Sequence, residues 1–212
     1  MAEAADSRPA QWGFESLQGY LSTPERVWAY SHALGCYLGD GCISRTSRTF
    51  RLRLFQDARY RATAEEWAAS LRVLFPDNRV HIGSAGRGRG CDVVGVYSNL
   101  LPLLFPQHGP GPKHERSLTL TDAQERVVRP RPLLRGLLHS DGCRYTETRP
   151  GRGKTYSYVM YAFTNKSEDL HAIVGAAAAR LSLRPTRTGT KNTFFRRRAD
   201  VQALDAFVGP KL

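Results

Sequence analysis

A short pattern that occurs twice in this chain of 212 residues constrains its fold more than any other feature. The first copy, ALGCYLGDGC, covers residues 33–42, and the second, LLRGLLHSDGC, covers residues 133–143. Each is an apolar, helix-like segment that ends Asp-Gly-Cys, and the aspartates Asp40 and Asp141 are separated by 141 − 40 = 101 residues. A repeat of this period predicts a chain built from two similar halves.

A second repeated element supports the same pairing. The tripeptide Gly-Pro-Lys follows the last predicted helix of each half and ends at Lys113 and Lys211, which lie 113 − 40 = 73 and 211 − 141 = 70 residues after the aspartates. A lone Asp-Gly after an apolar helix is also an ordinary helix terminator. Two copies, each followed by a lysine at nearly the same distance, predict equivalent positions in a duplicated fold.

The predicted helices and strands have the same order in both halves. In the first half, periodicity and turn residues predict helices at 24–39, 63–75 and 99–105 and strands at 42–46, 49–56, 79–83 and 91–97. In the second half they predict a helix ending at Asp141, helices at 168–181 and 200–208, and strands at 143–147, 155–164, 184–189 and 193–198. Thr63 and Glu66 have the spacing of a capping box at the start of the second helix.

This order predicts an α+β protein of two αββαββα halves, each with an antiparallel sheet. The expected division is a tail at 1–24, a first half at 25–106, a linker at 107–118 and a second half at 119–212. The tail lacks sustained periodicity, although its aromatic residues could dock onto the body of the protein: Trp12, Phe14 and Tyr20.

Small residues four positions apart mark one face of each repeated helix. Gly35 and Gly39 share a face of the first helix, and Gly136 and Ser140 share the equivalent face of the second. Such faces allow two helix backbones to approach closely. The two repeated helices are therefore predicted to pack against each other at the centre of the molecule, with their aspartates side by side.

Two carboxylates at adjacent helix C-termini indicate a cation. The negative end of the helix dipole disfavours each carboxylate by a few tenths to about 1 kcal/mol, and the carboxylates repel each other. A divalent ion relieves both costs, and hard oxygen ligands suit Mg²⁺ or Mn²⁺. The expected metal ligands are Asp40 and Asp141, with the last helical carbonyls at Gly39 and Ser140.

The charge indicates a polyanionic partner, nucleic acid first. Lys and Arg number 31 against 19 Asp and Glu, a formal charge of +12. Genome composition is the alternative explanation, but many basic residues fall in predicted strands and their loops. In 49–55, alternation places Arg51 and Arg53 opposite Phe50, Leu52 and Leu54. The predicted DNA contacts are Arg45, Arg48, Arg51, Arg53, Arg59, Arg87, Arg89, Arg144, Arg152, Lys154, Tyr156, Tyr158, Arg187, Lys191, Arg196 and Arg198.

The two Asp-Gly helices and the order of the elements resemble the single-chain LAGLIDADG homing endonucleases. The chain departs from the motif at Leu38 and His139, where the first aspartate of the motif name stands. The resemblance implies a monomeric, intron- or intein-associated enzyme whose two sheets form a saddle over a long, asymmetric double-stranded DNA site. It also implies metal-dependent phosphodiester hydrolysis with one aspartate from each half.

The resemblance further implies a basic residue near each metal that polarises the attacking water or offsets charge. Lys113 and Lys211 are the candidates, and the alternative is that each lysine caps a turn. Gln56 and Asn165 are candidates for orienting water, although Asn165 could equally cap a helix and alternation places Gln56 opposite the arginines. His139 is expected to belong to the packing between the helices or to approach the site.

Three functions remain open from the sequence. The first is the endonuclease, the second a related DNA-binding regulator or RNA splicing cofactor (maturase) that does not cut, and the third a basic structural RNA-binding protein. No run of about 18 apolar residues predicts a membrane span, and no secretory signal is present, so we expect a cytoplasmic, DNA-associated protein. The four cysteines show no zinc or disulfide spacing and are expected to be free thiols.

Overall fold

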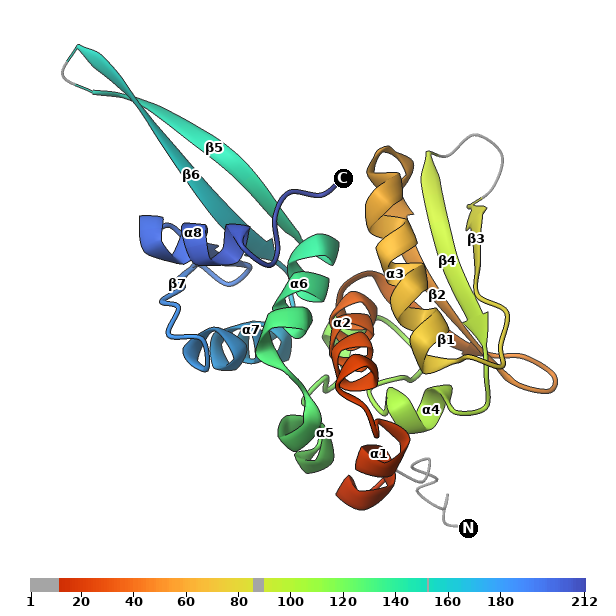
Figure 1. The fold of residues 1–212 in the computed structure, drawn as a ribbon. Helices are drawn as coiled ribbons and strands as arrows, with labels where there is room; N and C mark the ends of the chain where they lie inside the picture. The colour runs from red at the N-terminus through yellow and green to blue at the C-terminus, as the bar shows by residue number, and fades with distance from the viewer. Residues whose placement is uncertain (1–11, 86–89, 152) are drawn as a thin grey trace, which may run out of the picture.

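The computed structural model describes residues 12–85, 90–151 and 153–212, and within them the two predicted halves stand side by side (Figure 1). Each half contains a four-stranded antiparallel sheet, with strand order β1-β2-β4-β3 in the first and β5-β6-β8-β7 in the second. The repeated helices, α2 (Pro24–Asp40) and α6 (Pro130–Ser140), lie between the halves. The predicted α+β fold of two similar halves is confirmed.

The elements agree with the predicted order and differ mainly at their ends. The first half continues with β1 (Gly41–Arg45), β2 (Phe50–Asp57), α3 (Arg61–Leu74), β3 (His81–Ser84), β4 (Cys91–Tyr97) and α4 (Leu101–Leu104). The second half continues with β5 (Gly142–Gly151), β6 (Lys154–Thr164), α7 (Glu168–Ala179), β7 (Thr186–Thr188), β8 (Asn192–Phe195) and α8 (Arg198–Asp205). Two short 3₁₀ turns are also present: η1 (Ala58–Tyr60) directly follows β2, and η2 (Lys113–Glu115) lies between the halves in sequence and contains Lys113.

The contact between α2 and α6 requires glycine at two positions. A Cβ at Gly35 would collide with the carbonyl of Leu133 and would lie 2.9 Å from the backbone nitrogen of Leu137. A Cβ at Gly136 would collide with the carbonyl of His32 and lie 2.7 Å from the nitrogen of Cys36. The backbones therefore touch directly, as the small-residue faces predict.

The core follows from strand alternation and the helices that cover each sheet. In β2, Leu52 and Leu54 are buried, whereas Arg51 and Arg53 point to the other, partly exposed face. Trp67 of α3 is fully buried against this core. One apolar cluster extends through both halves, so the halves are packed as one body.

Two short helices correct the sequence predictions. Residues 14–20 of the expected tail form α1 (Phe14–Tyr20), which buries Leu17 and packs on α5 (Asp122–Val127), a helix that was not predicted. The hydroxyl of Tyr20 donates to the carbonyl of Leu74, so the tail docks through an aromatic residue as expected. Residues 14–20 of the expected tail thus form a helix that its lack of sustained periodicity did not predict, and residues 1–11 lie outside the described part of the chain.

The predicted capping box at the start of α3 is also wrong. The helix begins at Arg61, so Thr63 and Glu66 lie inside it. Thr63 is buried and its backbone nitrogen donates to the carbonyl of Leu212, 149 residues away. Long-range contacts therefore use both residues that the local pattern assigned to a cap.

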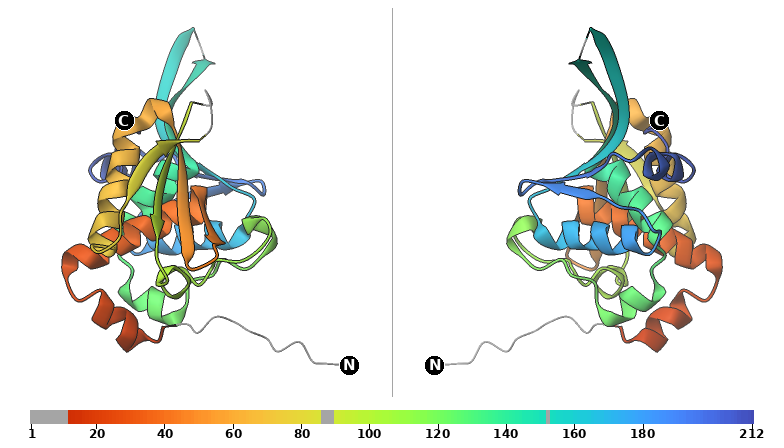
Figure 2. Two further views of the ribbon diagram at one scale, coloured as in Figure 1. Left: turned by 90° about the vertical axis from the view of Figure 1, so that its right-hand side faces the viewer. Right: turned by 90° about the vertical axis from the view of Figure 1, so that its left-hand side faces the viewer.

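The halves differ most in their first hairpins. β5 and β6 have 10 and 11 residues, against 5 and 8 for β1 and β2. The β5–β6 hairpin projects well beyond the rest of the molecule (Figure 2). Among the described residues, the helices are too short or too polar to cross a membrane.

Candidate functional site

The two aspartates lie together where α2 and α6 end. Asp40 is the last residue of α2, and Asp141 directly follows α6. Burial, and then the negative charge of Asp141, raise the pKa of Asp40 to about 6. Burial also raises the pKa of Asp141 above its usual value. Ionising both of these partly buried carboxyl groups is therefore unfavourable unless a counter-ion is bound.

Small residues bring these carboxyl groups close. A Cβ at Gly39 would collide with the side chain of Ser140 and lie 3.2 Å from Oδ2 of Asp141. The Ser140 hydroxyl is turned back into its own helix, where it donates to the carbonyls of Gly136 at 2.9 Å and Leu137 at 3.0 Å. The predicted pairing of these positions across the interface is what places one helix end against the other.

Lys113 lies at the end of the first helix. Its Nζ donates to the carbonyls of Tyr37 at 2.7 Å, Leu38 at 2.9 Å and Gly39. Burial lowers the pKa of Lys113 to about 8, although Asp141 and Asp40 act in the opposite direction. The ammonium group of Lys113 therefore binds the last carbonyls of α2 and also lies near both aspartates. A capping role and a role at the site are compatible for this lysine.

Lys211 has the equivalent place in the second half, with fewer contacts. Its Nζ donates to the carbonyl of Ser140 at 2.9 Å and lies 5.8 Å from the centre of the Tyr60 ring. Burial lowers its pKa, opposed by Asp40 first. Each of the two lysines thus stands beside one helix end and feels both carboxylates.

Gln56 and Asn165 occupy equivalent positions but bond differently. In the first sheet Gly41, which follows Asp40, pairs with Leu54, and Gln56 lies two residues after Leu54. In the second sheet Gly142, which follows Asp141, pairs with Phe163, and Asn165 lies two residues after Phe163. Asn165 donates to Oδ2 of Asp141 at 2.7 Å and also accepts from the nitrogen of Ser167 at 2.7 Å. It therefore holds the aspartate and supports the start of α7 at once.

Gln56 reaches across to the other half instead. It lies on the buried face of β2, opposite the arginines as alternation predicts. Its Nε2 donates to the carbonyl of His139 at 3.2 Å, and its Oε1 accepts from the nitrogen of Asp57 at 3.1 Å. In this structure Gln56 ties the two halves together beside the site.

The residues present fit a divalent cation of the hard, oxygen-seeking kind. Two carboxylates meet two helix-end carbonyls, those of Gly39 and Ser140, and each carbonyl oxygen has a second lone pair besides the one that its lysine uses. No group of three or more His, Cys, Asp or Glu side chains is gathered for a metal in the described residues. Mg²⁺ commonly takes one or two carboxylates and fills its other positions with water and substrate phosphate oxygens.

Sequence reasoning missed a set of contacts next to the site. Arg135 and Glu66 form a salt bridge between α6 and α3, and Arg116 binds three successive carbonyls just before Lys113. A charged residue inside the apolar helix segment LLRGLL was the available signal for Arg135. His139 is buried, and its Nε2 lies 3.5 Å from the carbonyl of Gly209, which follows α8.

The first sheet presents a cationic, aromatic face away from its helices. Arg51 and Arg53 of β2 lie on this face, which Tyr97 joins through its pairing with Arg51. The guanidinium of Arg51 lies 5.3 Å from the centre of the Tyr97 ring, and the His81 ring stacks on the same tyrosine. This arrangement places Arg51 and Arg53 on a shared outer surface, as predicted.

The second sheet presents two stacked tyrosines on the long hairpin. Tyr156 and Tyr158 are 43% and 49% exposed, and their ring centres lie 6.4 Å apart. Arg196 follows β8, with its guanidinium 4.0 Å from the centre of the Phe194 ring. Alternation places Phe194 and these tyrosines on the same side of the sheet, since Phe194 pairs with Ala162. Five other predicted DNA contacts, from both halves, are also exposed: Arg45, Arg48, Lys154, Lys191 and Arg198.

Some predicted DNA contacts have other partners. Arg144 binds both carboxylate oxygens of Asp205, at 2.7 and 3.0 Å, on the side of the sheet that α8 covers. Arg144, which pairs with Tyr161, therefore lies on the opposite face of the sheet from Tyr156 and Tyr158. Arg59 and Arg187 form exposed ion pairs with Asp57 and Glu168, which a phosphate can replace at little cost. Three further predicted contacts, Arg87, Arg89 and Arg152, lie outside the described residues.

The comparisons with known proteins concern the fold. The chain superimposes on the homing endonuclease I-DmoI in complex with DNA and Mn with a TM-score of 0.56 and 13% identity, over 87% of this chain and 97% of that one. The LAGLIDADG meganuclease I-AabMI bound to uncleaved DNA gives a TM-score of 0.53 and 14% identity, over 85% and 82%. A variant of I-SmaMI gives 0.54 and 10%, over 86% and 83%.

By sequence, no protein-family model and no curated protein matches the chain. The likeness is therefore one of fold, and it extends over most of each chain. The chain has the fold of the single-chain LAGLIDADG homing endonucleases.

Proposed function

We propose that this protein is a site-specific, double-stranded DNA endonuclease that hydrolyses phosphodiester bonds with Mg²⁺ or Mn²⁺. The observation that carries the proposal is the pairing of Asp40 and Asp141 at the ends of two touching helices. Burial raises both pKa values, and the charge of Asp141 raises that of Asp40 further, so ionising both carboxyl groups has an electrostatic cost that a divalent cation relieves. The solved structures with this fold include complexes with DNA in which Mn, Mg or Ca is present.

Each residue of the site has a chemical task in this proposal. Asp40, Asp141 and the carbonyls of Gly39 and Ser140 would hold the cation, which when bound acts as a Lewis acid and lowers the pKa of a water molecule. Lys113 is mainly cationic at pH 7, because its pKa is about 8, and offsets negative charge on the phosphate. Lys211 does the same at the second helix end. Asn165 orients the Asp141 carboxylate through its amide.

The surfaces on either side of the site suit duplex DNA. The charge of +12 supports phosphate binding that weakens steeply with salt. Arg51, Arg53, Tyr156 and Tyr158 lie on outer sheet faces, where side chains can contact base edges and backbone. The two faces are unlike, so we propose a long asymmetric target bound by a single chain.

The test begins by selecting bound duplexes from a random pool. The selected duplex is then incubated with Mg²⁺, and cutting of both strands is compared among the wild type, Asp40→Asn, Asp141→Asn and the matched control Asp77→Asn, an exposed aspartate in a turn after α3. We expect cutting by the wild type and the control, and a loss of about 1000-fold or more in each site variant.

Two outcomes would overturn the proposal. Selective binding by the wild type with no metal-dependent cutting would identify a DNA-binding regulator. Cutting of both strands at full rate by either asparagine variant would show that the paired aspartates are not a shared site. Tighter binding of RNA in a parallel selection from a random RNA pool would favour the splicing-cofactor alternative.

A further inference from the structure

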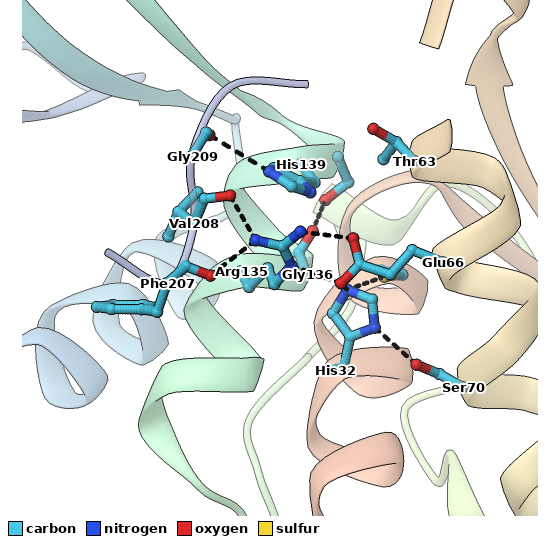
Figure 3. A network of polar contacts seen from close by, with 12 residues as sticks. His32, Thr63, Glu66, Ser70, Arg135, Gly136, His139, Phe207, Val208 and Gly209 are labelled. Carbon is cyan, nitrogen blue, oxygen red and sulfur yellow. Dashed lines mark hydrogen bonds and ion pairs between the residues drawn. The ribbon is translucent and has the colours of Figure 1, made fainter. Parts of the chain in front are cut away.

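We propose that Arg135 and Glu66 are positioning residues that hold Lys211 in place and so control one of the two strand cuts. This inference rests on the proposed nuclease function for its kinetic consequence, but its structural part is independent of that function. It concerns the segment 206–212, which follows α8 and contains Lys211. The contacts around this segment are drawn in Figure 3.

Arg135 binds the Glu66 carboxylate of α3 and also two backbone carbonyls of segment 206–212. Its Nε and Nη2 donate to the two carboxylate oxygens of Glu66 at 2.5 and 2.7 Å. Its Nη1 donates to the carbonyls of Phe207 at 2.7 Å and Val208 at 2.5 Å (Figure 3). A planar guanidinium can make a two-pronged bond to a carboxylate and still bind carbonyls with its remaining donor, which a lysine cannot do. Arg135 thus ties segment 206–212 to α6 and, through Glu66, to α3. We call these contacts of Arg135 with Glu66, Phe207 and Val208 the clamp.

The neighbours of Glu66 keep its carboxyl group ionised and fix its position. Burial alone would raise its pKa, but the hydrogen bonds from Arg135 and the nearby His32 ring lower it below its usual value. His32 Nε2 lies 3.7 Å from the carboxylate, and His32 Nδ1 lies 2.8 Å from the Ser70 hydroxyl. Glu66 is therefore an anionic, sterically fixed anchor in the first half.

The segment then carries this anchoring to Lys211. Beyond Val208, the carbonyl of Gly209 lies 3.5 Å from Nε2 of His139. The backbone of Leu212 is fixed at both its nitrogen and its carbonyl by Thr63 of α3. Lys211 lies between these two attachments, where its Nζ reaches the carbonyl of Ser140 at 2.9 Å. The position of the second-half lysine thus depends in part on the first half, through Glu66, which holds Arg135, and through Thr63.

Lys113 is held by a different device. Arg116 donates to the carbonyls of Gly109, Pro110 and Gly111 at 2.6, 3.0 and 2.9 Å. These contacts lie within a single loop, and Lys113 itself has three carbonyl partners. Loosening Arg135 should therefore displace Lys211 and leave Lys113 in place, which gives the proposal its strand selectivity.

The first experiment measures the two strand cuts separately on an end-labelled duplex. The variants are Arg135→Met, Glu66→Gln and the pair together, which removes both charges and avoids an unpaired half-buried ion. Glu65→Gln is the matched control, because Glu65 is the neighbouring, exposed residue of the same helix. We expect the clamp variants to slow the strand that Lys211→Met slows, by about 10- to 100-fold, and to leave the other strand within about twofold.

Double variants distinguish positioning from a general structural role. Arg135→Met should add little to Lys211→Met, because both act on one group, and should add fully to Lys113→Met. Arg135→Lys should restore only part of the rate, because it keeps the charge without the fork. Equal slowing of both strands, or full additivity with Lys211→Met, would overturn the positioning role.

The second experiment needs neither DNA nor metal. Amine acetylation followed by mass spectrometry compares the reactivity of Lys211 with that of Lys113 and the exposed Lys191. We expect the Arg135→Met/Glu66→Gln variant to raise Lys211 labelling several-fold and to leave the other two unchanged. Unchanged Lys211 labelling would refute the clamp even if the protein cuts DNA. Increased labelling with no cutting by the wild type would uphold the clamp and refute the nuclease function.

Discussion

In the first half Lys113 donates to three carbonyls at the end of its own helix, whereas in the second half Lys211 donates to one carbonyl and lies on a segment tied to the opposite half. The aspartates differ in the reverse sense, because Asp141 is held by Asn165 while the equivalent Gln56 binds the backbone of His139. Each half thus stabilises a different member of its Asp–Lys pair.

This difference shows what a duplicated fold preserves. The geometry of the α2–α6 contact is shared by both halves, since each helix needs a glycine where the other crosses it. The supporting contacts are free to diverge, because they can be made by any residue that reaches the same atoms. The common interface should therefore be the most sensitive feature, and the divergent supports should give smaller, half-specific effects.

The largest expected effect is on the shared interface. Gly136→Val should lower the free energy of unfolding by about 3 kcal/mol or more, because the new side chain meets backbone atoms of α2 that cannot move aside. Gly175→Ala is the control, since α7 has open space at that glycine and alanine favours the helix. Urea unfolding measures both. A Gly136→Val protein as stable as the wild type would mean that the helices do not touch in this way.

The second effect tests whether the lysines serve separate strands. Lys113→Met and Lys211→Met should each slow one cut by about 100-fold, or about 2.7 kcal/mol, because each removes the positive charge at one helix end. The two variants should affect opposite strands, giving nicked circles from a plasmid that carries the target. If both variants slowed the same strand, the lysines would not be equivalent members of a pseudo-symmetric site.

Some of this arrangement was predictable from the sequence, and some was not. Local periodicity and the repeated Asp-Gly ends located α2, α6, Asp40 and Asp141, because small residues four apart define a helix face without further information. The same local rules failed at Thr63, whose hydrogen-bond partner is Leu212, 149 residues away. They also missed α1 and α5, short helices that are stabilised by packing on each other and on the core.

The side chains of the site show the same limit. The lysines were found because their tag is repeated, so that one copy supported the other. The pairing of Glu66 with Arg135 has no counterpart of that kind in the sequence, and only the fold brings α3 against α6 at this point. Repetition therefore predicts what the halves share, and three-dimensional contacts are needed for what distinguishes them.

The third effect concerns pH and the metal. The folded-state pKa of Asp40 is raised to about 6, so its contribution to the stability of the metal-free protein is present below about pH 4 and is lost as the pH rises through 6. Binding of Mg²⁺ requires the ionised carboxylate and has the opposite dependence. The affinity should rise about fivefold between pH 5 and pH 6 and level off above pH 7.

Thermal unfolding with and without Mg²⁺ at several pH values measures this dependence. The stabilisation by Mg²⁺ should be weaker at pH 5 than at pH 7.5, and it should be lost in Asp40→Asn at every pH. Equal stabilisation of the wild type at both pH values would contradict the raised pKa. Equal stabilisation of Asp40→Asn and the wild type would remove Asp40 from the metal site.

The smallest effect compares the equivalent residues Asn165 and Gln56. The Asn165 amide lowers the pKa of Asp141 against the larger effect of burial, so Asn165→Ala should raise that pKa further. Mg²⁺ affinity should then fall more at pH 6 than at pH 8, because a carboxyl group with a higher pKa holds its proton more strongly against the metal and this competition weakens as the pH rises. Isothermal titration at both pH values measures the difference.

Gln56→Ala should behave differently, because Gln56 binds a backbone carbonyl of the other half and no carboxylate in the contacts described for it. Losing that buried hydrogen bond should lower the free energy of unfolding by about 1 kcal/mol and leave the pH dependence of Mg²⁺ affinity as in the wild type. If Gln56→Ala shifted the pH dependence as much as Asn165→Ala does, the two halves would support their aspartates alike. The division between a held aspartate in one half and a held lysine in the other would then be wrong.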